Sequence, residues 1–268
     1  MSILVKGATA ENVQITLART LLDWGEYVSP RGLTTFELQN VMLVLEDPSR
    51  CYPHGIRDKM NINVGIVEAL QLIGGFSDPE RTVAFVPNMK QFQNNGVFDG
   101  AYGARTQGQL QRIVDILRKD WASRQAVITI RDPYRDLMPG SNDIPCTIAA
   151  SFRIRNGKLF MTTHMRSNDI VWGLPYDMFQ FSMLQLTLAK VLNVGLGTYT
   201  HIADSLHMYD HHVADVERIA RSTPRITDAK RFDGLEDVGQ RAIDIFYGKD
   251  VVAPNDTEKF FIERMSKK

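Results

Sequence analysis

The sequence predicts one α+β domain, spanning 1–268, that contains a substantial β-sheet. Two β-rich runs, Thr147–Arg155 and Lys158–His164, flank Asn156-Gly157, a dipeptide that adopts the left-handed conformations of a tight type I′ hairpin. The stretches Ala10–Gly25 and Asp177–Val191 instead space their apolar residues three and four positions apart, which predicts helices. Because no repeat, low-complexity tract or linker separates these strands and helices, we expect them to share one core.

The other expected elements follow the same two patterns along the chain. Further helices are predicted over Asn63–Ile73, where Gly74 and Gly75 form a stop, over Gln107–Lys119 and over Asp210–Ala220. Further strands are predicted over Thr35–Leu45, Ala126–Arg131 and Leu196–His207. From Arg231 onward the pattern indicates one more helix and a charged end that frays.

Charge and composition exclude several classes of protein. Lys plus Arg equals Asp plus Glu at 31 each, so no overall field holds the chain on a nucleic-acid backbone or a membrane surface, and no dedicated nucleic-acid binding is expected. No apolar run approaches the ~20 residues that span a bilayer, and the first residues lack the apolar stretch of a secretory signal. With only two cysteines, Cys51 and Cys146, we expect a cytoplasmic protein without a disulfide or a metal site, in the host cytoplasm if it is viral.

Cys146 is the first candidate for chemistry, and its sequence context leaves two interpretations open. Free cysteines are usually small core residues, which is the commoner case. A nucleophilic cysteine instead needs cations that stabilise its thiolate, and both His164 and Arg166 lie on the returning arm of the predicted hairpin.

Other polar residues stand out against apolar surroundings. Glu68 is the lone acid on its predicted helix, where a carboxylate is either a satisfied core acid or a functional group. The cluster 166–169 reads either as a solvated turn or, through Arg166 and with Arg31, as a phosphate site. His207 and Tyr209 flank Met208 near the end of a strand, so both side chains should face one side, by default for packing.

Taken together, these motifs resemble the thymidylate synthase superfamily and, more closely, the phage deoxycytidylate hydroxymethylases. The resemblance runs from Arg31 to about His212 and covers most of the chain. It is carried by motifs in matching order: Arg31-Gly32, Val67-Glu68-Ala69-Leu70, Tyr102-Gly103, Ser123-Arg124, Pro145-Cys146, Arg166-Ser167-Asn168-Asp169, Gly173-Leu174-Pro175-Tyr176-Asp177 and Ser205-Leu206-His207-Met208-Tyr209.

The resemblance implies a thymidylate synthase-like fold, with a large mixed β-sheet flanked by helices, in a homodimer built back to back on that sheet. The active sites would be shared between subunits. Arg31, Arg166 and Ser167 would hold the nucleotide phosphate together with Arg124 of the partner subunit. Synthases usually place two arginines in tandem at the shared position, whereas this chain has Gln125 second.

The resemblance also implies the chemistry of each remaining residue. Cys146 would attack C6 of a pyrimidine, and C5 would then accept a one-carbon unit from 5,10-methylenetetrahydrofolate. Glu68 would move protons. Asp169 would hold the folate, and His207 and Tyr209 would contact the sugar. Tyr102 and Thr147 are further candidates for the site.

Departures from the synthase pattern favour a cytosine nucleotide and water. Asp177 stands where uracil-specific enzymes carry asparagine, and an ionised carboxylate, which has only acceptors, suits the 4-amino group of cytosine. Thr147 replaces the histidine that usually follows the nucleophile, as it does in the hydroxymethylases. Residues 81–101 contain no tryptophan, and the printed chain ends in Ser266-Lys267-Lys268 instead of an apolar tail, so water should reach the reacting carbon.

The resemblance therefore implies hydroxymethylation at C5 of a cytidine nucleotide, dCMP or CMP, with dCMP preferred. The alternatives are a C5-methylating enzyme of the thymidylate synthase type acting on dUMP or dCMP, a CMP hydroxymethylase, and a non-catalytic homologue that binds nucleotides or RNA.

Overall fold

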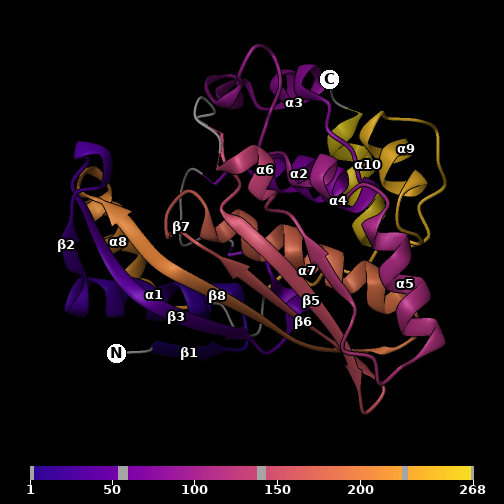
Figure 1. The fold of residues 1–268 in the computed structure, drawn as a ribbon, viewed down its shortest axis with the longest axis horizontal. Coiled ribbons are helices and arrows are strands. Elements are labelled where there is room, and N and C mark those ends of the chain that lie inside the picture. The colour runs from indigo at the N-terminus through magenta and orange to yellow at the C-terminus, as the bar shows by residue number, and fades with distance from the viewer. Residues whose placement is uncertain (1–2, 54–59, 138–142, 225–228, 267–268) are drawn as a thin grey trace.

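A computed structural model of the protein describes residues 3–53, 60–137, 143–224 and 229–266, and its core is a mixed eight-stranded sheet (Figure 1). Adjacent strands lie in the order β1 (Ile3–Gly7), β3 (Thr35–Leu45), β8 (Gly195–Tyr209), β6 (Lys158–Met165), β5 (Thr147–Arg155) and β4 (Val127–Thr129). Two short strands complete it: β2 (Glu26–Val28) pairs with β3, and β7 (Asn168–Asp169) pairs with β8. The predicted α+β class with a large mixed sheet is confirmed.

The β5–β6 hairpin forms where the sequence places it. Asn156 and Gly157 have φ angles of 51° and 68°, the left-handed conformations that a two-residue turn requires, and Arg155 pairs with Lys158 across it. Side chains of β6 then alternate between buried and half-buried. At its other end β5 has a bulge between Thr147 and Ala149, directly after Cys146.

The helices are α1 (Ala10–Trp24), α2 (Ile62–Gly74), α3 (Pro79–Phe85), α4 (Tyr102–Thr106), α5 (Gln109–Lys119), α6 (Pro133–Asp136), α7 (Leu174–Val191), α8 (Val213–Arg221), α9 (Gln240–Phe246) and α10 (Asp256–Met265). Short 3₁₀ turns cover Pro30–Gly32, Pro48–Arg50, Pro87–Phe92 and Asp210–His212. The helix predicted over Gln107–Lys119 starts two residues later, and the strand predicted over Ala126–Arg131 is shorter than expected. Among the described helices, none is long and apolar enough to cross a bilayer.

Helix α7 is the centre of the packing. It is buried along nearly its whole length because β6 and β8 cover one side and α2 covers another (Figure 1). Pro175 stands in its first turn, where the missing N–H costs nothing, so the helix starts earlier than the predicted Asp177. Helix α2 ends as predicted, with Gly75 in the left-handed conformation at φ 69°. Asp177 and Glu68 therefore come from two helices that pack together.

The end of the chain differs from the prediction. Instead of one helix and a frayed end, α9 and α10 form and pack against each other. Asn255 caps α10 by accepting from the N–H of Glu258, and the buried Glu258 carboxylate pairs with Arg241. Phe261 is fully buried. The sequence pattern missed this docking because half of the residues of α10 are charged and only one side of it meets the core. Lys267 and Lys268 lie outside the described residues.

The docking of α10 predicts a clear loss of stability when its apolar anchor is removed. Phe261→Ala should lower the free energy of unfolding by about 3–5 kcal/mol, because it deletes a buried ring and leaves a cavity. Urea titration followed by circular dichroism measures this change. The matched control is Glu263→Ala on the exposed side of the same helix, which should stay within about 0.5 kcal/mol of the wild type. Equal stability of both variants would contradict the docking of α10.

Candidate active site

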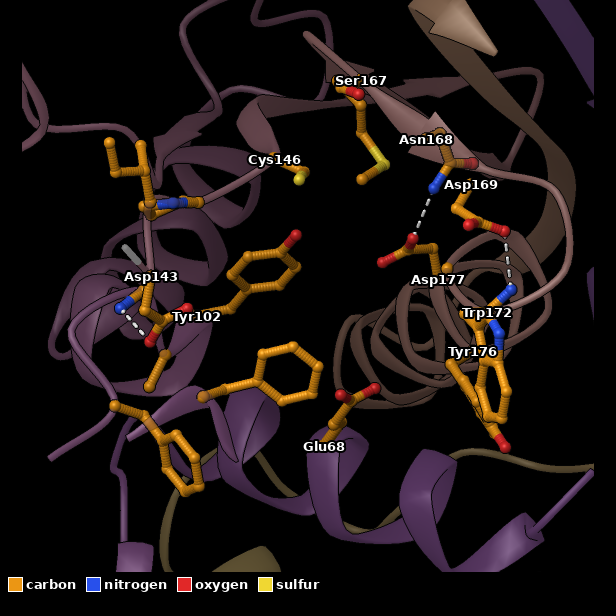
Figure 2. Close-up of a pocket in the computed structure, with 18 of the residues that line it drawn as sticks. Glu68, Tyr102, Asp143, Cys146, Ser167, Asn168, Asp169, Trp172, Tyr176 and Asp177 are labelled. Carbon is orange, nitrogen blue, oxygen red and sulfur yellow. Dashed lines mark hydrogen bonds between the residues drawn. The ribbon is translucent and has the colours of Figure 1, made fainter. Parts of the chain in front are cut away.

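One pocket, with a volume of about 630 Å³, opens where the ends of β6, β7 and β8 meet helices α2 and α7. Most of the residues that the sequence singled out lie in its wall: Arg31, Glu68, Tyr102, Cys146, Arg166, Ser167, Asp169, Asp177, His207 and Tyr209. Figure 2 shows Cys146, Tyr102, Glu68 and Asp177 facing the same space from different sides. Arg124 and Thr147 are not part of this wall.

Cys146 is held at the pocket by Arg166. The Arg166 backbone N–H donates to the Cys146 carbonyl at 2.9 Å, and its guanidinium donates to the carbonyls of Pro145 and Ile144 at 3.1 and 3.0 Å. Burial raises the pKa of the Cys146 thiol above its usual value, the Arg166 charge opposes this shift, and the nearby Asp177 carboxylate adds to it. The thiol is thus neutral at rest, and Arg166 is the charge positioned to favour its thiolate.

His164, the other expected partner of the thiol, lies elsewhere. Its Nε2 lies 2.7 Å from Asp204 Oδ1, both side chains are about half exposed, and His164 is not part of the pocket wall. The prediction that it assists Cys146 is wrong. Strand β6 ends at Met165, so His164 follows the alternation of the strand whereas Arg166 has left it and turns toward Cys146.

Thr147 and Tyr102 contact each other next to Cys146. The Thr147 N–H donates to the Tyr102 hydroxyl at 3.3 Å, and the Thr147 side chain is fully buried. The Tyr102 ring stacks on Phe181 of α7 with ring centres 5.9 Å apart. Burial raises the pKa of Tyr102 well above its usual value, so this phenol stays neutral and can donate a hydrogen bond into the pocket.

Two carboxyl groups, Asp177 and Glu68, form the most perturbed part of the pocket. Asn168 Nδ2 donates to Asp177 Oδ2 at 2.7 Å, while Gln180 Nε2 lies 3.1 Å from Asp177 Oδ1 and 3.4 Å from Glu68 Oε2. Burial raises the pKa of Glu68 to about 8, and the charge on Asp177 adds to this shift. Burial raises the pKa of Asp177 to about 7, against the hydrogen bonds from Asn168 and Gln180. Near neutral pH these acids therefore retain protons.

Asn168 and Gln180 had no separate role in the sequence analysis. Asn168 belongs to the polar cluster at 166–169, and its burial at 2% exposure was the missing information. Gln180 follows Asp177 by three positions, which places both on one side of α7, so a polar residue at this spacing in an apolar helix was a usable signal.

The opposite rim of the pocket is aromatic and polar. His207 and Tyr209 both face it, with Met208 buried between them, as the alternation predicted. Their rings meet edge to face at 5.4 Å. Asp169 Oδ1 accepts from the N–H groups of Val171 and Trp172 at 2.6 and 2.8 Å and so shapes the turn into α7 (Figure 2).

The arginines differ in position. Arg31 lines the pocket mouth from the 3₁₀ turn Pro30–Gly32, where it is exposed and has the left-handed φ of 56°. Arg124 is exposed on the loop between α5 and β4 and is absent from the wall. One chain thus brings two arginines, Arg31 and Arg166, to the pocket with Ser167 beside them.

The sequence model described as thymidylate synthase matches residues 83–246. This chain belongs to the thymidylate synthase family. It is 31% identical over 221 residues to a deoxyuridylate hydroxymethyltransferase of Bacillus phage SP01, covering 76% of this chain and 58% of the phage protein. A protein of the same name from Pseudomonas phage M6 is 32% identical over 163 residues, or 58% of this chain and 46% of the relative. A putative thymidylate synthase of Methanosarcina barkeri is 29% identical over 199 residues, or 71% of this chain and 82% of the relative.

The chain spans about half to three-fifths of the length of its phage relatives. The resemblance seen in the sequence is confirmed at the level of the family and of its fold. The phage relatives of this family are named for deoxyuridylate, whereas the sequence analysis favoured a cytosine nucleotide. The preferred base therefore has to be inferred from the pocket residues of this chain.

Thymidylate synthase-family enzymes use methylenetetrahydrofolate, and the chemistry of the pocket fits such a ligand. Phe92 and Trp172 line the pocket with about half of each side chain exposed, so flat apolar faces are available for stacking. Asp169 lies beside Trp172 and suits the amino and N–H donors of a pterin. Within the described part of the chain, no group of His, Cys, Asp and Glu side chains is arranged to hold a metal ion.

The raised pKa values predict how stability depends on pH. The pKa of Glu68 is about 8 in the folded protein and about 4.3 in an unfolded chain, so between these values the folded state binds more protons. The free energy of unfolding should then fall as pH rises from 5 to 8. Glu68→Gln removes this carboxyl, so its free energy of unfolding should fall less than that of the wild type over that range. The two falls should differ by at least about 1 kcal/mol.

Urea titrations at pH 5, 6.5 and 8 measure this difference. Glu263→Gln, an exposed acid on α10, serves as the control and should keep the pH dependence of the wild type. If Glu68→Gln keeps that dependence as well, the pKa of Glu68 is not raised.

Proposed function

We propose that this protein is a cytidylate 5-hydroxymethyltransferase, which transfers the one-carbon unit of methylenetetrahydrofolate to C5 of dCMP and adds water to it. The observation that carries the proposal is Asp177, a buried acid in the pocket wall whose two oxygens accept from Asn168 and Gln180. The hydroxymethyltransferase names of the phage relatives support the type of product.

Asp177 supports cytosine through its hydrogen-bonding capacity. As a carboxylate it has only acceptors, which suit the 4-amino group of cytosine and repel the O4 carbonyl of uracil. Its pKa of about 7 also lets the acid carry a proton, which the N3 atom of cytosine can accept. Asn168 and Gln180 each use one lone pair of an Asp177 oxygen, so both oxygens keep capacity for the base.

The wall formed by 81–101 supports water as the final nucleophile. This segment contains no tryptophan, and it contributes to the pocket Thr82, Met89, Phe92, Phe98, Gly100 and Ala101. Phe92 is about half exposed, so the wall leaves the pocket open to solvent on this side. A methyl product would instead need the reacting carbon to be shielded until hydride arrives.

In the proposed mechanism, methylenetetrahydrofolate supplies the one-carbon unit and leaves as tetrahydrofolate. The Cys146 thiol gives up its proton to solvent as its sulfur bonds to C6 of the base, and C5 becomes a carbon nucleophile that bonds to the one-carbon unit. Glu68 takes up the proton that C5 loses. Water then adds to the new exocyclic carbon and gives up a proton, and elimination of the Cys146 thiolate restores the C5–C6 double bond. No reductant is consumed, since water adds without a change in oxidation level.

The remaining residues would bind the substrates. Arg31, Arg166 and Ser167 would hold the phosphate, which explains how a chain of zero net charge takes up an anion. His207 and Tyr209 would contact the sugar, and Asp169 with Trp172 the folate. Tyr102 would donate to the nucleotide or to a water beside it, while Thr147 acts from behind through its backbone contact with Tyr102.

We further propose that the protein works as a homodimer joined through the sheet. The helices that contact the central strands lie on one face of it (Figure 1). On those strands, side chains that alternate with the buried ones stay half-buried, among them Arg153, Thr162 and Ile202. A second copy on this face would cover them and would bring Arg124 of the partner subunit toward the phosphate.

A second candidate, methylation at C5, is favoured by the relatives named putative thymidylate synthases. The mass of the product separates it from hydroxymethylation, and reactions with dCMP, CMP and dUMP separate the three nucleotides.

Substitution at position 177 tests the choice of base. Asp177→Asn should move the preference from dCMP toward dUMP, because the amide presents one acceptor and one donor where the acid presents acceptors. A mismatched buried polar pair costs about 1–3 kcal/mol, so the ratio of kcat/KM for the two nucleotides should change at least about tenfold. Products formed with methylenetetrahydrofolate are identified by mass.

The wild type should convert dCMP to its 5-hydroxymethyl derivative. A methylated product would overturn the hydroxymethylation, and a wild-type preference for dUMP would overturn the cytidylate assignment. Asp204→Asn, which changes an exposed acid outside the pocket, is the control and should leave the base preference unchanged.

Mixed dimers test the shared site. Arg124→Ala and Cys146→Ser should each be nearly inactive alone, while Cys146→Ser should still bind nucleotide because the arginines remain. After subunit exchange, one site of each heterodimer has an intact Cys146 in one chain and an intact Arg124 in the other. Activity should therefore return to about a quarter of the wild-type level in a statistical mixture. Verified heterodimers without activity would contradict a shared site.

A further inference from the structure

Gln180 occupies a position between two acids that come from different helices. Its side chain is 3% exposed, and its single amide nitrogen lies 3.1 Å from Asp177 Oδ1 and 3.4 Å from Glu68 Oε2. An amide nitrogen carries two N–H donors, so one can point to each carboxyl group. The contact spans 112 positions of sequence between Glu68 and Gln180, so it exists only because α2 packs against α7.

We propose that Gln180 is a positioning residue that joins Glu68 and Asp177 into one acid pair, so that recognition of the base at Asp177 sets the charge on Glu68. This inference rests on the proposed function, since it takes cytosine as the group that meets Asp177 and Glu68 as the proton carrier.

The surroundings of the pair support this coupling. Both acids have raised pKa values, and the Asp177 charge is itself one cause of the raised pKa of Glu68. Tyr102 from α4, Tyr199 from β8 and Cys146 before β5 are the other ionisable groups that feel the Asp177 charge. Burial raises the pKa of all three, so they remain neutral near pH 7 and do not compensate a second negative charge.

Arg166 is the cation on this side of the pocket, and its guanidinium is already bonded to the carbonyls of Ile144 and Pro145. Gln180 is the side chain whose amide nitrogen lies within hydrogen-bonding distance of both carboxyl groups, so its two N–H donors are placed to stabilise the charged form of each. When Asp177 is neutral, Glu68 no longer faces a neighbouring charge and ionises more easily.

Cytosine would use this coupling. Its N3 atom is an acceptor, so a bound cytosine favours the form in which Asp177 keeps a proton and shares it with N3. Glu68 then loses the negative charge beside it and is free to ionise and accept a proton. Uracil carries a hydrogen on N3 and cannot hold the Asp177 proton in this way. The pair would therefore select cytosine in two ways, by binding the base and by letting Glu68 ionise when cytosine is bound.

Proton uptake during nucleotide binding tests the pair without any turnover. Calorimetry of dCMP binding, in buffers with different ionisation enthalpies, counts the protons taken up from pH 6 to 9. The free pair loses its protons through about pH 7 and 8, whereas the bound pair must keep one on Asp177. The wild type should thus take up about one proton at pH 9 and progressively less as pH falls.

Gln180→Met keeps the shape and removes both donors, so the acids should ionise about one pH unit higher and the uptake at pH 9 should fall to about half. Asp177→Asn should abolish the uptake. Gln71→Met is the matched control, because Gln71 lines the same pocket but donates to Val67 O and Thr82 Oγ1, and it should keep the wild-type uptake. Circular dichroism verifies that each variant is folded.

The outcomes separate the two proposals. If the wild type binds dUMP and not dCMP, the proposed function fails. If it binds dCMP and forms the hydroxymethyl product, yet Gln180→Met keeps the wild-type uptake curve, the acid pair is overturned while the function stands. The acid pair is supported if proton uptake on dCMP binding shifts to higher pH in Gln180→Met and stays at the wild-type pH in Gln71→Met.

Discussion

The burial of the Asp177 carboxyl at the start of α7 is the constraint around which the site is arranged. Helix α7 is covered by the sheet and by α2, so an acid on it is far from bulk water and must find donors within the protein. Asn168 supplies one from the short strand β7, and Gln180 supplies another from the next turn of the helix. Because these donors only partly offset the cost of burial, Asp177 keeps a raised pKa, which is the property that suits it to hold a proton against a base.

The turn between β7 and α7 connects Asp177, which is proposed to meet the base, to the segment that holds Cys146. Asp169 fixes the turn between β7 and α7 through two backbone N–H groups, and Asn168 beside it bonds Asp177. One residue further back, the polar cluster begins with Ser167 and Arg166, and Arg166 holds the chain around Cys146. A displacement of this short segment would therefore move Asp177, the proposed phosphate contacts and Cys146 together.

In the proposed function, a chain without net charge binds an anionic nucleotide through cations that are placed locally. Arg166 uses its Nε and one Nη2 donor on backbone carbonyls, which orients its fork and leaves its remaining N–H donors for a ligand. Arg31 is exposed in a left-handed conformation that is sparsely populated outside glycine, as is common for residues at binding sites. One chain brings Arg31 and Arg166 to the pocket, and in the proposed dimer Arg124 of the partner subunit would be a third cation there.

Much of the local structure was predictable from the sequence. Backbone preferences place the Asn156-Gly157 hairpin and the Gly75 end of α2, and the period of two puts His207 and Tyr209 on one side of their strand. Of the twelve site residues that the family motifs indicated, ten lie in the pocket wall, since their chemistry is carried by residue type and order. These properties depend on residues close in sequence or on the identity of single side chains.

Other features depend on contacts between distant residues, and only the tertiary structure decided them. The direction of His164 follows from where β6 ends, and the docking of α10 follows from the burial of Phe261 in the folded core. The acid pair is the clearest case. The sequence by itself determined that Glu68 and Asp177 are acids in apolar helices, but only the packing of α2 on α7 brought Glu68 within reach of Gln180. That packing also buries both acids, which raises the pKa of each, and the nearby Asp177 charge adds to the shift of Glu68.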